Sequence, residues 1–510
     1  MQQEKLESLY KRYEDSNVVL ASEQLARWTI PSVMLKPDTV QDGKRVLMER
    51  DYQSKGARLV NSLASKIVQS LIPDNTPFFS IKLDDALQGE VQSGLNISSD
   101  QYESQLIQWA TDASARAITG TSYSKYSHLA KLLVITGNAL LYRDPSNYDT
   151  SVYSLRQYVV NRDGWGNVTC IIIKERVQVQ DLPETLRNTE FKDKPEWENL
   201  TLYTQVRLNK QKNVWEVTQE VQGITLDDVS TYPKNLCPYI VCTANLNTGE
   251  HYGRGIVEDY APDFARLSEL STALQMYEIE SLRLLNFVAS QTGLDIQQLD
   301  DAAVGEYLQA EKDGIFAHEG GTSQKMQVIQ AEIQSIFQEL SQAFMYTGNF
   351  RQAERVTAEE IRAVIQETNV GHLSVFSHIS ETFLKPLAHL LLFEVEPKLN
   401  LILLNNQAQL QLQVGASVVN KSVQVDRLLQ ATLSIQQILP VLAQVSPRFN
   451  QDAVIDKIMQ GFSIDVSEIT YTPEQLKQQQ EQADLEAQQQ QQAQSGMSDP
   501  NLVAQMTGAL

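Results

Sequence analysis

Apolar residues recur every three or four positions through most of the first 142 residues, which is the spacing of one face of an α-helix. This pattern predicts helices over 57–71 and over Gln101–Ile118, and a third helix that ends near Thr136. We expect the next segment, Gly137–Tyr142, to be a packed helix end or turn. The first third of the chain is therefore predicted to form a helical layer.

The pattern changes to that of β-strands between about residues 151 and 244. Tyr158–Val160 and Val168–Ile173 are β-branched or aromatic runs, and the glycine-containing turn 161–166 between them predicts a β-hairpin. Further runs of the same kind cover 202–208, 214–221 and 239–243. We expect a β-rich part here, interrupted by a solvated, turn-rich stretch at Asp181–Glu198.

A long amphipathic helix is predicted from Pro262, a residue that suits a first helical turn, to Leu285. Short glycine-bounded segments and a small helical piece at Gln297–Gln309 follow it. Helix returns at Ala331–Tyr346, and after a polar break it resumes at Thr357–Gln366. The order helix, compact α/β segment, helix, loop and helix is unusual for a simple globular domain.

Some apolar residues of the Pro262 helix lie away from its main stripe. They are Ile279, Leu282, Leu284 and Leu285. These side chains are more than one partner helix would cover, so we expect neighbouring copies of the chain to bury them. The alternative is that they line an ordinary monomeric core.

Strongly apolar helices continue at Phe376–Leu392 and Val423–Leu442, and the end of the chain, from Pro473, is rich in Gln. Such a low-complexity tract can extend a helix or a coil, but it cannot build a core. We expect this tail to be frayed, or to be ordered only by a partner.

The charge balance narrows the function. The chain has 510 residues, with 42 Lys and Arg against 63 Asp and Glu, for a formal net charge of −21. A nucleic-acid binder held by a general basic surface is therefore disfavoured, although DNA that only passes by is not. The start of the chain lacks the pattern of a secretory signal, and no apolar run approaches the ~20 residues of a membrane span, so we expect neither.

Residues that would carry catalysis do not cluster in the sequence. There is no P-loop motif, and the six His do not form a zinc motif. Cys170, Cys237 and Cys242 fit neither a disulfide framework nor a zinc site, which indicates a reducing compartment. His372 and His378 are interpreted as helix-surface or interface residues. We therefore predict a protein that is not an enzyme and holds neither a cofactor nor a metal.

Two weaker motifs have a structural and a functional interpretation. Gly253-Arg254-Gly255 could offer amide groups to a phosphate, but a tight turn into a helix that contains Glu258 is favoured. The pairs Asp227-Asp228 and Asp300-Asp301 could suggest metal carboxylates, yet adjacent acids point in different directions and are usually solvated.

One segment, 350–362, combines a polar loop with a sharp helix start. Thr357 with Glu360 three residues later forms a capping box, and Arg351 and Arg355 lie in the loop before it. The structural interpretation is an ordinary surface loop before a well-capped helix. Together with the helix order upstream, however, this segment resembles the tunnel loop and following helix of phage portal proteins.

The resemblance extends through most of the chain from Ala26 to about Arg362. The matching stretches, in family order, are Trp28–Ser32, Gly56–Lys66, Gly137–Tyr142, Tyr232–Lys234 with Cys237–Ile240, and Tyr252–Arg254. Together they are similar to the head-to-tail connector (portal) proteins of short-tailed, autographivirus-type phages. The last third matches mainly in helical character and in its Gln-rich end.

This resemblance implies a mixed α+β, mainly α-helical portal fold, in a ring of about twelve copies at one capsid vertex. Its parts would be the wing (1–261, with the β-rich part at about 151–244, and 357–404), the stem helices (262–285 and 331–346), the clip (286–330), the tunnel loop (347–356), the crown (405–472) and the tail (473–510).

The implied partners are those of a virion component assembled in the host bacterial cytoplasm. They are the terminase large subunit, the tail adaptor protein, the major capsid and scaffolding proteins, the internal core or ejection proteins, and double-stranded viral DNA in the channel; no membrane is implied. A ring of chains with this charge would not grip the polyanion that slides through it.

The resemblance also implies site residues. The DNA channel and tunnel loop would hold Asn349, Phe350, Arg351, Gln352 and Arg355, and the tunnel helix cap Thr357 and Glu360. The clip, which faces the terminase and the adaptor, would present Asp300, Asp301, Glu306, Lys312, His318 and Lys325. Of the two tunnel arginines, Arg351 is the better candidate for the lumen, because Arg355 lies nearer the helix cap.

Two other function classes stay open at the level of the sequence. The first is an internal or tail-associated virion assembly protein without a channel, which would give filaments, open arrays or monomers. The second is an enzyme such as a nuclease or a peptidoglycan hydrolase. It would require clustered carboxylates, or a nucleophile with a base, in one pocket.

Overall fold

The computed structural model describes residues 5–35, 48, 51–73, 77–82, 85–95, 99–119, 122–226, 229–281, 284–288, 297, 315–319, 323–346, 377–399, 402 and 411–414. The chain divides into two compact units, 1–418 and 419–510, and all described residues belong to the first.

Helices dominate the first part of the chain, as the apolar spacing predicted. They are α1 (Leu6–Tyr13), α2 (Ser16–Trp28), the 3-10 turn η1 (Pro31–Met34), α3 (Lys55–Leu71), α4 (Asp85–Leu95), α5 (Ser99–Ile118) and α6 (Ser122–Thr136). The predictions for 57–71 and for Gln101–Ile118 are confirmed by α3 and α5, and the predicted helix end at Thr136 is confirmed by α6. The packing of α6 is unusual, because its last five residues are all buried.

The prediction for Gly137–Tyr142 was wrong after its first residue. Asn138–Arg143 is strand β2, which lies between β10 (Tyr239–Thr243) and β3 (Thr150–Tyr153) in a three-stranded antiparallel sheet. A continuous apolar run is buried on both faces and shows no alternation, so sequence periodicity does not distinguish it from a helix end. Strand β1 (Phe79–Lys82) also falls within the part that we expected to be helical.

A larger antiparallel sheet confirms the predicted β-rich part. Its strands are β4 (Tyr158–Arg162), β5 (Val168–Gln178), β6 (Asn199–Asn209), β7 (Val214–Val221), β8 (Ile224–Thr225) and β9 (Ser230–Pro233). The predicted hairpin is β4–β5, and the Asp163 carboxylate accepts hydrogen bonds from the Trp165 amide at 3.0 Å and the Asn167 amide at 2.8 Å. The turn is therefore held by its own side chain.

The stretch Asp181–Glu198 is less solvated than we expected. It contains the end of the 3-10 turn η2 (Val179–Asp181) and the short helix α7 (Glu184–Thr189). Leu182 and Phe191 are buried in a small separate cluster with residues of the large sheet. Two isolated apolar residues in a polar loop thus cover one end of the sheet.

Two long helices follow, with boundaries that differ from the prediction. Helix α9 (Ala261–Ser281) follows the short helix α8 (Ile256–Asp259) and ends four residues before Leu285, because Leu284–Val288 is strand β11 and pairs with β12 (Ile315–Glu319). Helix α11 (Ser323–Ala343) starts eight residues before Ala331, because polar residues that suit a helix precede its apolar stripe.

The described C-terminal segments pack back on the first part. Residues 377–395 are helical, with a π-helical turn, η5 (Ser380–Leu384), before α14 (Lys385–Val395). Strand β13 (Gln411–Val414) pairs with β1, so the first unit continues past residue 405, where we expected the crown to begin. The helix expected at Val423–Leu442 and the tail from Pro473 lie outside the described residues. No helix among the described residues is long and apolar enough to cross a membrane.

A buried ion pair connects the sheet to α14. The Arg143 guanidinium on β2 donates to both carboxylate oxygens of Glu394, through Nε at 2.5 Å and Nη2 at 2.9 Å. The two side chains are only 4% and 7% exposed. Burial acts to lower the pKa of Arg143, but the hydrogen bond to Glu394 and neighbouring groups outweigh it and raise that pKa. The pair therefore joins segments that lie 251 residues apart in the sequence.

Removing one charge of this pair should destabilise the protein strongly. We expect Glu394→Gln to lower the free energy of unfolding by about 3 kcal/mol, because it leaves the Arg143 charge buried without a counter-ion. The exposed i,i+4 pair of Lys385 with Glu381 gives the control, and Glu381→Gln should cost less than about 1 kcal/mol. Urea unfolding followed by circular dichroism measures both, and equal costs would contradict the role of the buried pair.

Candidate functional site

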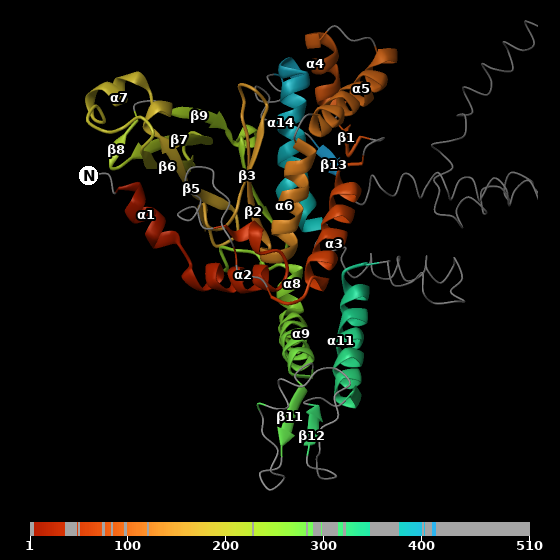
Figure 1. The fold of residues 1–510 in the computed structure, drawn as a ribbon. Helices are drawn as coiled ribbons and strands as arrows, with labels where there is room; N and C mark the ends of the chain where they lie inside the picture. Colours follow the sequence, from red (N-terminus) through yellow and green to blue (C-terminus); the bar gives the residue numbers. More distant parts are fainter. Residues whose placement is uncertain are drawn as a thin grey trace, which may run out of the picture. The chain divides into compact units, whose positions relative to one another are not determined.

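The two long helices α9 and α11 run side by side (Figure 1) and are packed through apolar faces. The buried side chains of this contact are Phe264, Leu267, Ile333, Ile336, Phe337 and Leu340. The Arg266 side chain on α9 also forms an ion pair with Glu332 on α11. The amphipathic stripe predicted from Pro262 therefore has its partner within the same chain.

Aromatic rings pack together where α9 begins and α11 ends. The Phe344 ring is fully buried between Tyr260 and Phe264, with ring centroids 5.8 and 5.5 Å apart. Lys66 of α3 donates to the main-chain oxygen of Met345, where α11 has ended. The end of α11 is therefore anchored on the body, by which we mean the described residues among 5–260 and 377–399.

The point where the chain leaves the body toward α9 is fixed by a close backbone contact. Gly137 has a φ of 73°, and a Cβ there would lie 2.2 Å from the carbonyl carbon of Arg254. The Asn138 side chain accepts from the Gly253 amide and donates to the Gly253 oxygen, both at 2.7 Å. Only glycine fits such an approach at this φ.

This contact decides between the two interpretations of Gly253-Arg254-Gly255. The amides of Gly253 and Arg254 already donate to Asn138 and to the Asn245 oxygen, so they are not available for a phosphate. Arg254 forms ion pairs with Glu250 and Glu258. The favoured interpretation, a tight turn into the helix that contains Glu258, is confirmed by α8.

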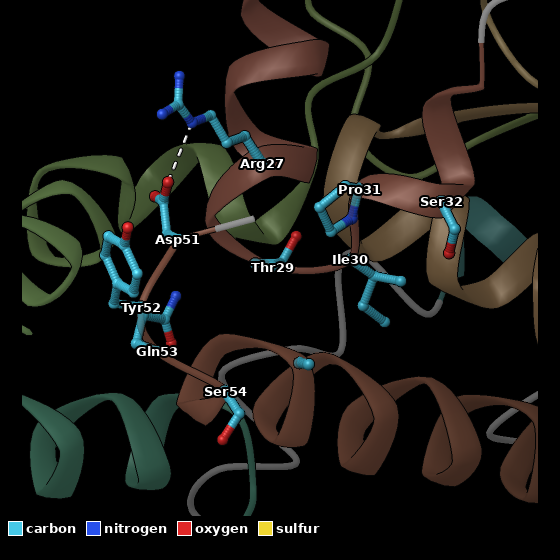
Figure 2. Close-up of a pocket in the computed structure, with 10 residues that line it drawn as sticks. Arg27, Thr29, Ile30, Pro31, Ser32, Asp51, Tyr52, Gln53 and Ser54 are labelled. Atoms are coloured by element: carbon cyan, nitrogen blue, oxygen red, sulfur yellow. Dashed lines mark hydrogen bonds and ion pairs between the residues drawn. The ribbon is translucent and has the colours of Figure 1, made fainter. Parts of the chain in front are cut away.

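A second contact that holds α9 on the body is made by Asp51, which lines a cavity of about 480 Å³ (Figure 2). The Asp51 carboxylate accepts from Arg27 Nε on α2 at 3.0 Å, and also from the Ser268 hydroxyl on α9. Gln53 accepts from the Gly56 amide at 2.9 Å. The segment 51–54 thus connects α2, α3 and α9. Among the described residues that line the cavity, Asp51 supplies the one carboxylate, and it is already used in holding α9.

The faces of the two long helices that point away from their mutual contact carry apolar side chains that the other described residues leave exposed. Met276 and Ile279 on α9 are 65% and 59% exposed, and Val328 on α11 is 70% exposed. Ile279 is therefore off the main stripe, as predicted. Leu284 and Leu285 belong to β11 instead of the helix, and Leu282 lies outside the described residues.

Most of the site residues implied by the resemblance lie outside the described residues. These are the tunnel-loop residues Asn349, Phe350, Arg351, Gln352 and Arg355, the cap residues Thr357 and Glu360, and the clip residues Asp300, Asp301, Glu306 and Lys312. Asp227-Asp228 and His372 also lie outside them. Two clip residues are described: His318, opposite Leu285 in the pairing of β12 with β11, and Lys325, exposed on the first turn of α11.

His378 lies on the helix that packs against β10. Its Nε2 is 3.0 Å from the Thr243 hydroxyl, and burial together with the charge of Arg162 lowers its pKa. It is thus half-buried in a packing contact between two elements of the same chain. In the described part of the chain, no group of three or more His, Cys, Asp and Glu side chains gathers as metal ligands do.

Comparison with known proteins identifies the family. The family described as "Bacteriophage head to tail connecting protein" matches residues 3–498. The portal protein of Pseudomonas phage phiKMV is 36% identical over 510 residues, which covers 98% of each chain. The portal protein of Escherichia phage T7 is 26% identical, over 92% of this chain and 89% of its own.

Among solved structures, the chain matches one from the virion of a native gene transfer agent particle. The TM-score is 0.38 and the identity 11%, over 84% of this chain and 98% of the other. The match to the family and to full-length relatives carries the assignment: the chain belongs to the bacteriophage head to tail connecting proteins, the structural family of phage portal proteins.

Proposed function

We propose that about twelve copies of this chain close into a ring at one capsid vertex, and that viral DNA passes through the ring during packaging and ejection. The observation that carries this proposal is the paired α9 and α11, which have a packed inner face and an uncovered apolar outer face. A ring is built from a heterologous interface repeated around one axis, and such an interface needs apolar surface that the single chain leaves exposed.

In this proposal α9 and α11 are the stem, and the body is the wing. The segment between the two helices, with β11 and β12, is the clip, which meets the terminase large subunit and later the tail adaptor protein. Residues 347–356 are the tunnel loop, which follows the anchored end of α11. The crown is residues 405–472, of which the structure describes 411–414, the strand β13 that pairs with β1.

The net negative charge of the chain favours a passage through which DNA slides and argues against a site that binds DNA. A net charge of −21 per copy gives a ring that repels phosphates overall, so that DNA slides instead of being held. A few arginines repeated by symmetry at a constriction would touch the backbone without reading its sequence. We infer that Arg351 supplies this contact. The capsid and scaffolding proteins and the internal core proteins are the further partners of this role.

Charged substitutions on the outer stem face should prevent ring closure. We expect Met276→Lys with Ile279→Lys to leave the chain folded, because both side chains are solvent-exposed in one copy, and to abolish the ring. Ile107→Lys is the control, since Ile107 is 64% exposed but lies on α5 of the body. Size-exclusion chromatography with light scattering measures the assembly. Rings of normal mass from the stem variant would contradict the proposed interface.

Reversing the charge of Arg351 in the proposed tunnel loop should reduce DNA packaging or retention and leave ring assembly unchanged. We expect Arg351→Glu to give rings of normal mass and heads with reduced packaged or retained DNA, because a repeated carboxylate repels the phosphates that pass it. Arg351→Lys keeps the charge and should package normally. DNA per purified head, measured by quantitative PCR after nuclease treatment, checks both variants. Normal packaging by Arg351→Glu would show that Arg351 does not face the DNA.

A further inference from the structure

The exposed apolar side chains of α9 and α11 lie at the same level along the helix pair. The two helices are antiparallel (Figure 1), and the Phe264 ring near the start of α9 meets the Phe344 ring just past the end of α11. Ile279 lies 279 − 264 = 15 residues beyond Phe264, and Val328 lies 344 − 328 = 16 residues before Phe344. At a rise of ~1.5 Å per residue, each lies about 22 to 24 Å from the aromatic contact.

A cavity of about 470 Å³ gives the same alignment of the two helices independently. Gln275 of α9 and Ile333 of α11 both line it. Gln275 lies 275 − 264 = 11 residues beyond Phe264, and Ile333 lies 344 − 333 = 11 residues before Phe344. The equal level of the exposed apolar side chains therefore does not depend on the ring contact alone.

These exposed side chains also lie on opposite sides of the helix pair. Met276 follows the fully buried Leu267 by 276 − 267 = 9 residues, and Val328 precedes the buried Phe337 by 337 − 328 = 9 residues. Nine residues are about two and a half helical turns, so each exposed side chain points away from the buried face of its own helix. Because the buried faces meet each other, Met276 and Val328 point in opposite directions.

The surroundings of both exposed positions suit contact with a second copy of this acidic chain. Ala273 beside Met276, and Gln327 and Ala331 beside Val328, are exposed and uncharged. Two chains of net charge −21 repel each other, so they approach most easily where the facing surfaces are neutral. Apolar groups also gain from a protein surface that excludes water, which DNA phosphates do not provide.

We propose that Val328 of one copy packs against Met276 and Ile279 of the next copy around the ring. This inference rests on the proposed ring and names the side chains that close it. Rotation about an axis along the helices keeps each residue at one height in every copy, so the two sides of a repeated contact must match in level. They must also lie on opposite sides of the chain, because the contact is heterologous. Val328 and the α9 pair meet both conditions.

Cysteine cross-linking of the full-length chain tests this contact. We expect Ile279→Cys/Val328→Cys, treated with a short bismaleimide, to give a ladder of covalent oligomers on a denaturing gel, because each copy becomes linked to the next on both sides. Both side chains are exposed in one copy, so the fold tolerates the changes. The wild-type chain controls for the native cysteines, which are buried or half-buried.

Single variants establish that the contact is heterologous. Ile279→Cys alone and Val328→Cys alone should give no more cross-linked product than the wild type. When differently tagged chains of these two variants assemble together, they should give dimers that carry one tag of each kind and nothing larger. Ile107→Cys/Val328→Cys is the matched control, since Ile107 is 64% exposed on α5, and it should give no ladder.

A charge pair tests the same contact through its energy. We expect Ile279→Lys to raise the chain concentration at which half of the rings dissociate by about tenfold, because a charge replaces an apolar group in the contact. Ile279→Lys/Val328→Glu should recover most of this loss, since opposite charges then meet between copies. Mass photometry over a dilution series measures both. Damage to the fold of the single chain would not be repaired by Val328→Glu.

The proposed contact is overturned if the double cysteine variant forms rings without a ladder, if a single cysteine variant gives as much dimer as the double variant gives product, or if Val328→Glu restores nothing. In each of these cases rings of normal mass leave the proposed function standing. A ladder from open assemblies that never close would support the contact and contradict the ring. The two proposals therefore fail separately.

Discussion

The place where α9 leaves the body depends on a backbone contact that has no room for a side chain. Gly137, at the end of α6, lies against the carbonyl of Arg254, and Asn138 holds Gly253 by two hydrogen bonds. Because α8 and α9 begin within a few residues of this contact, it sets where Phe264 meets Phe344 and hence where α11 ends. Any residue larger than glycine at position 137 would clash with the Arg254 backbone, so the path of the chain into α8 and α9 depends on this glycine.

The charged groups that hold the fold together lie in the body and where it meets α9, whereas the long helices expose apolar groups. In the interior, Arg143 forms an ion pair with Glu394. Where α9 meets the body, the Asp51 carboxylate accepts hydrogen bonds from Arg27 and Ser268. Arg162 differs, because it is buried and its described partners are carbonyl oxygens. The long helices instead expose apolar groups, which suits contact with another copy more than contact with DNA. The net negative charge of the chain fits a path that DNA passes without being bound.

Local pattern predicted the elements that have a clear period, such as α3, α5, the β4–β5 hairpin and α9. Prediction from local pattern failed for β2, a strand that is buried on both faces and so shows no alternation of apolar and polar residues. It also failed for Leu284, which belongs to β11 because that segment pairs with the remote strand β12. Contacts between remote segments leave no local trace: Arg143 and Glu394 are 251 residues apart, and Asp51 and Ser268 are 217 apart. Of the candidate site residues, Ile279 was found from its place off the helical stripe, whereas the tunnel-loop residues rest on the family resemblance.

The central claim is that the chain closes a ring around an axial channel through its paired helices. Native mass spectrometry of the purified full-length chain, with electron microscopy of the same sample, tests it most directly. The account predicts closed particles of about twelve times the chain mass of 57.4 kDa, with an axial hole lined by α9 and α11. Open filaments, or closed particles in which these helices lie away from the hole, would contradict it.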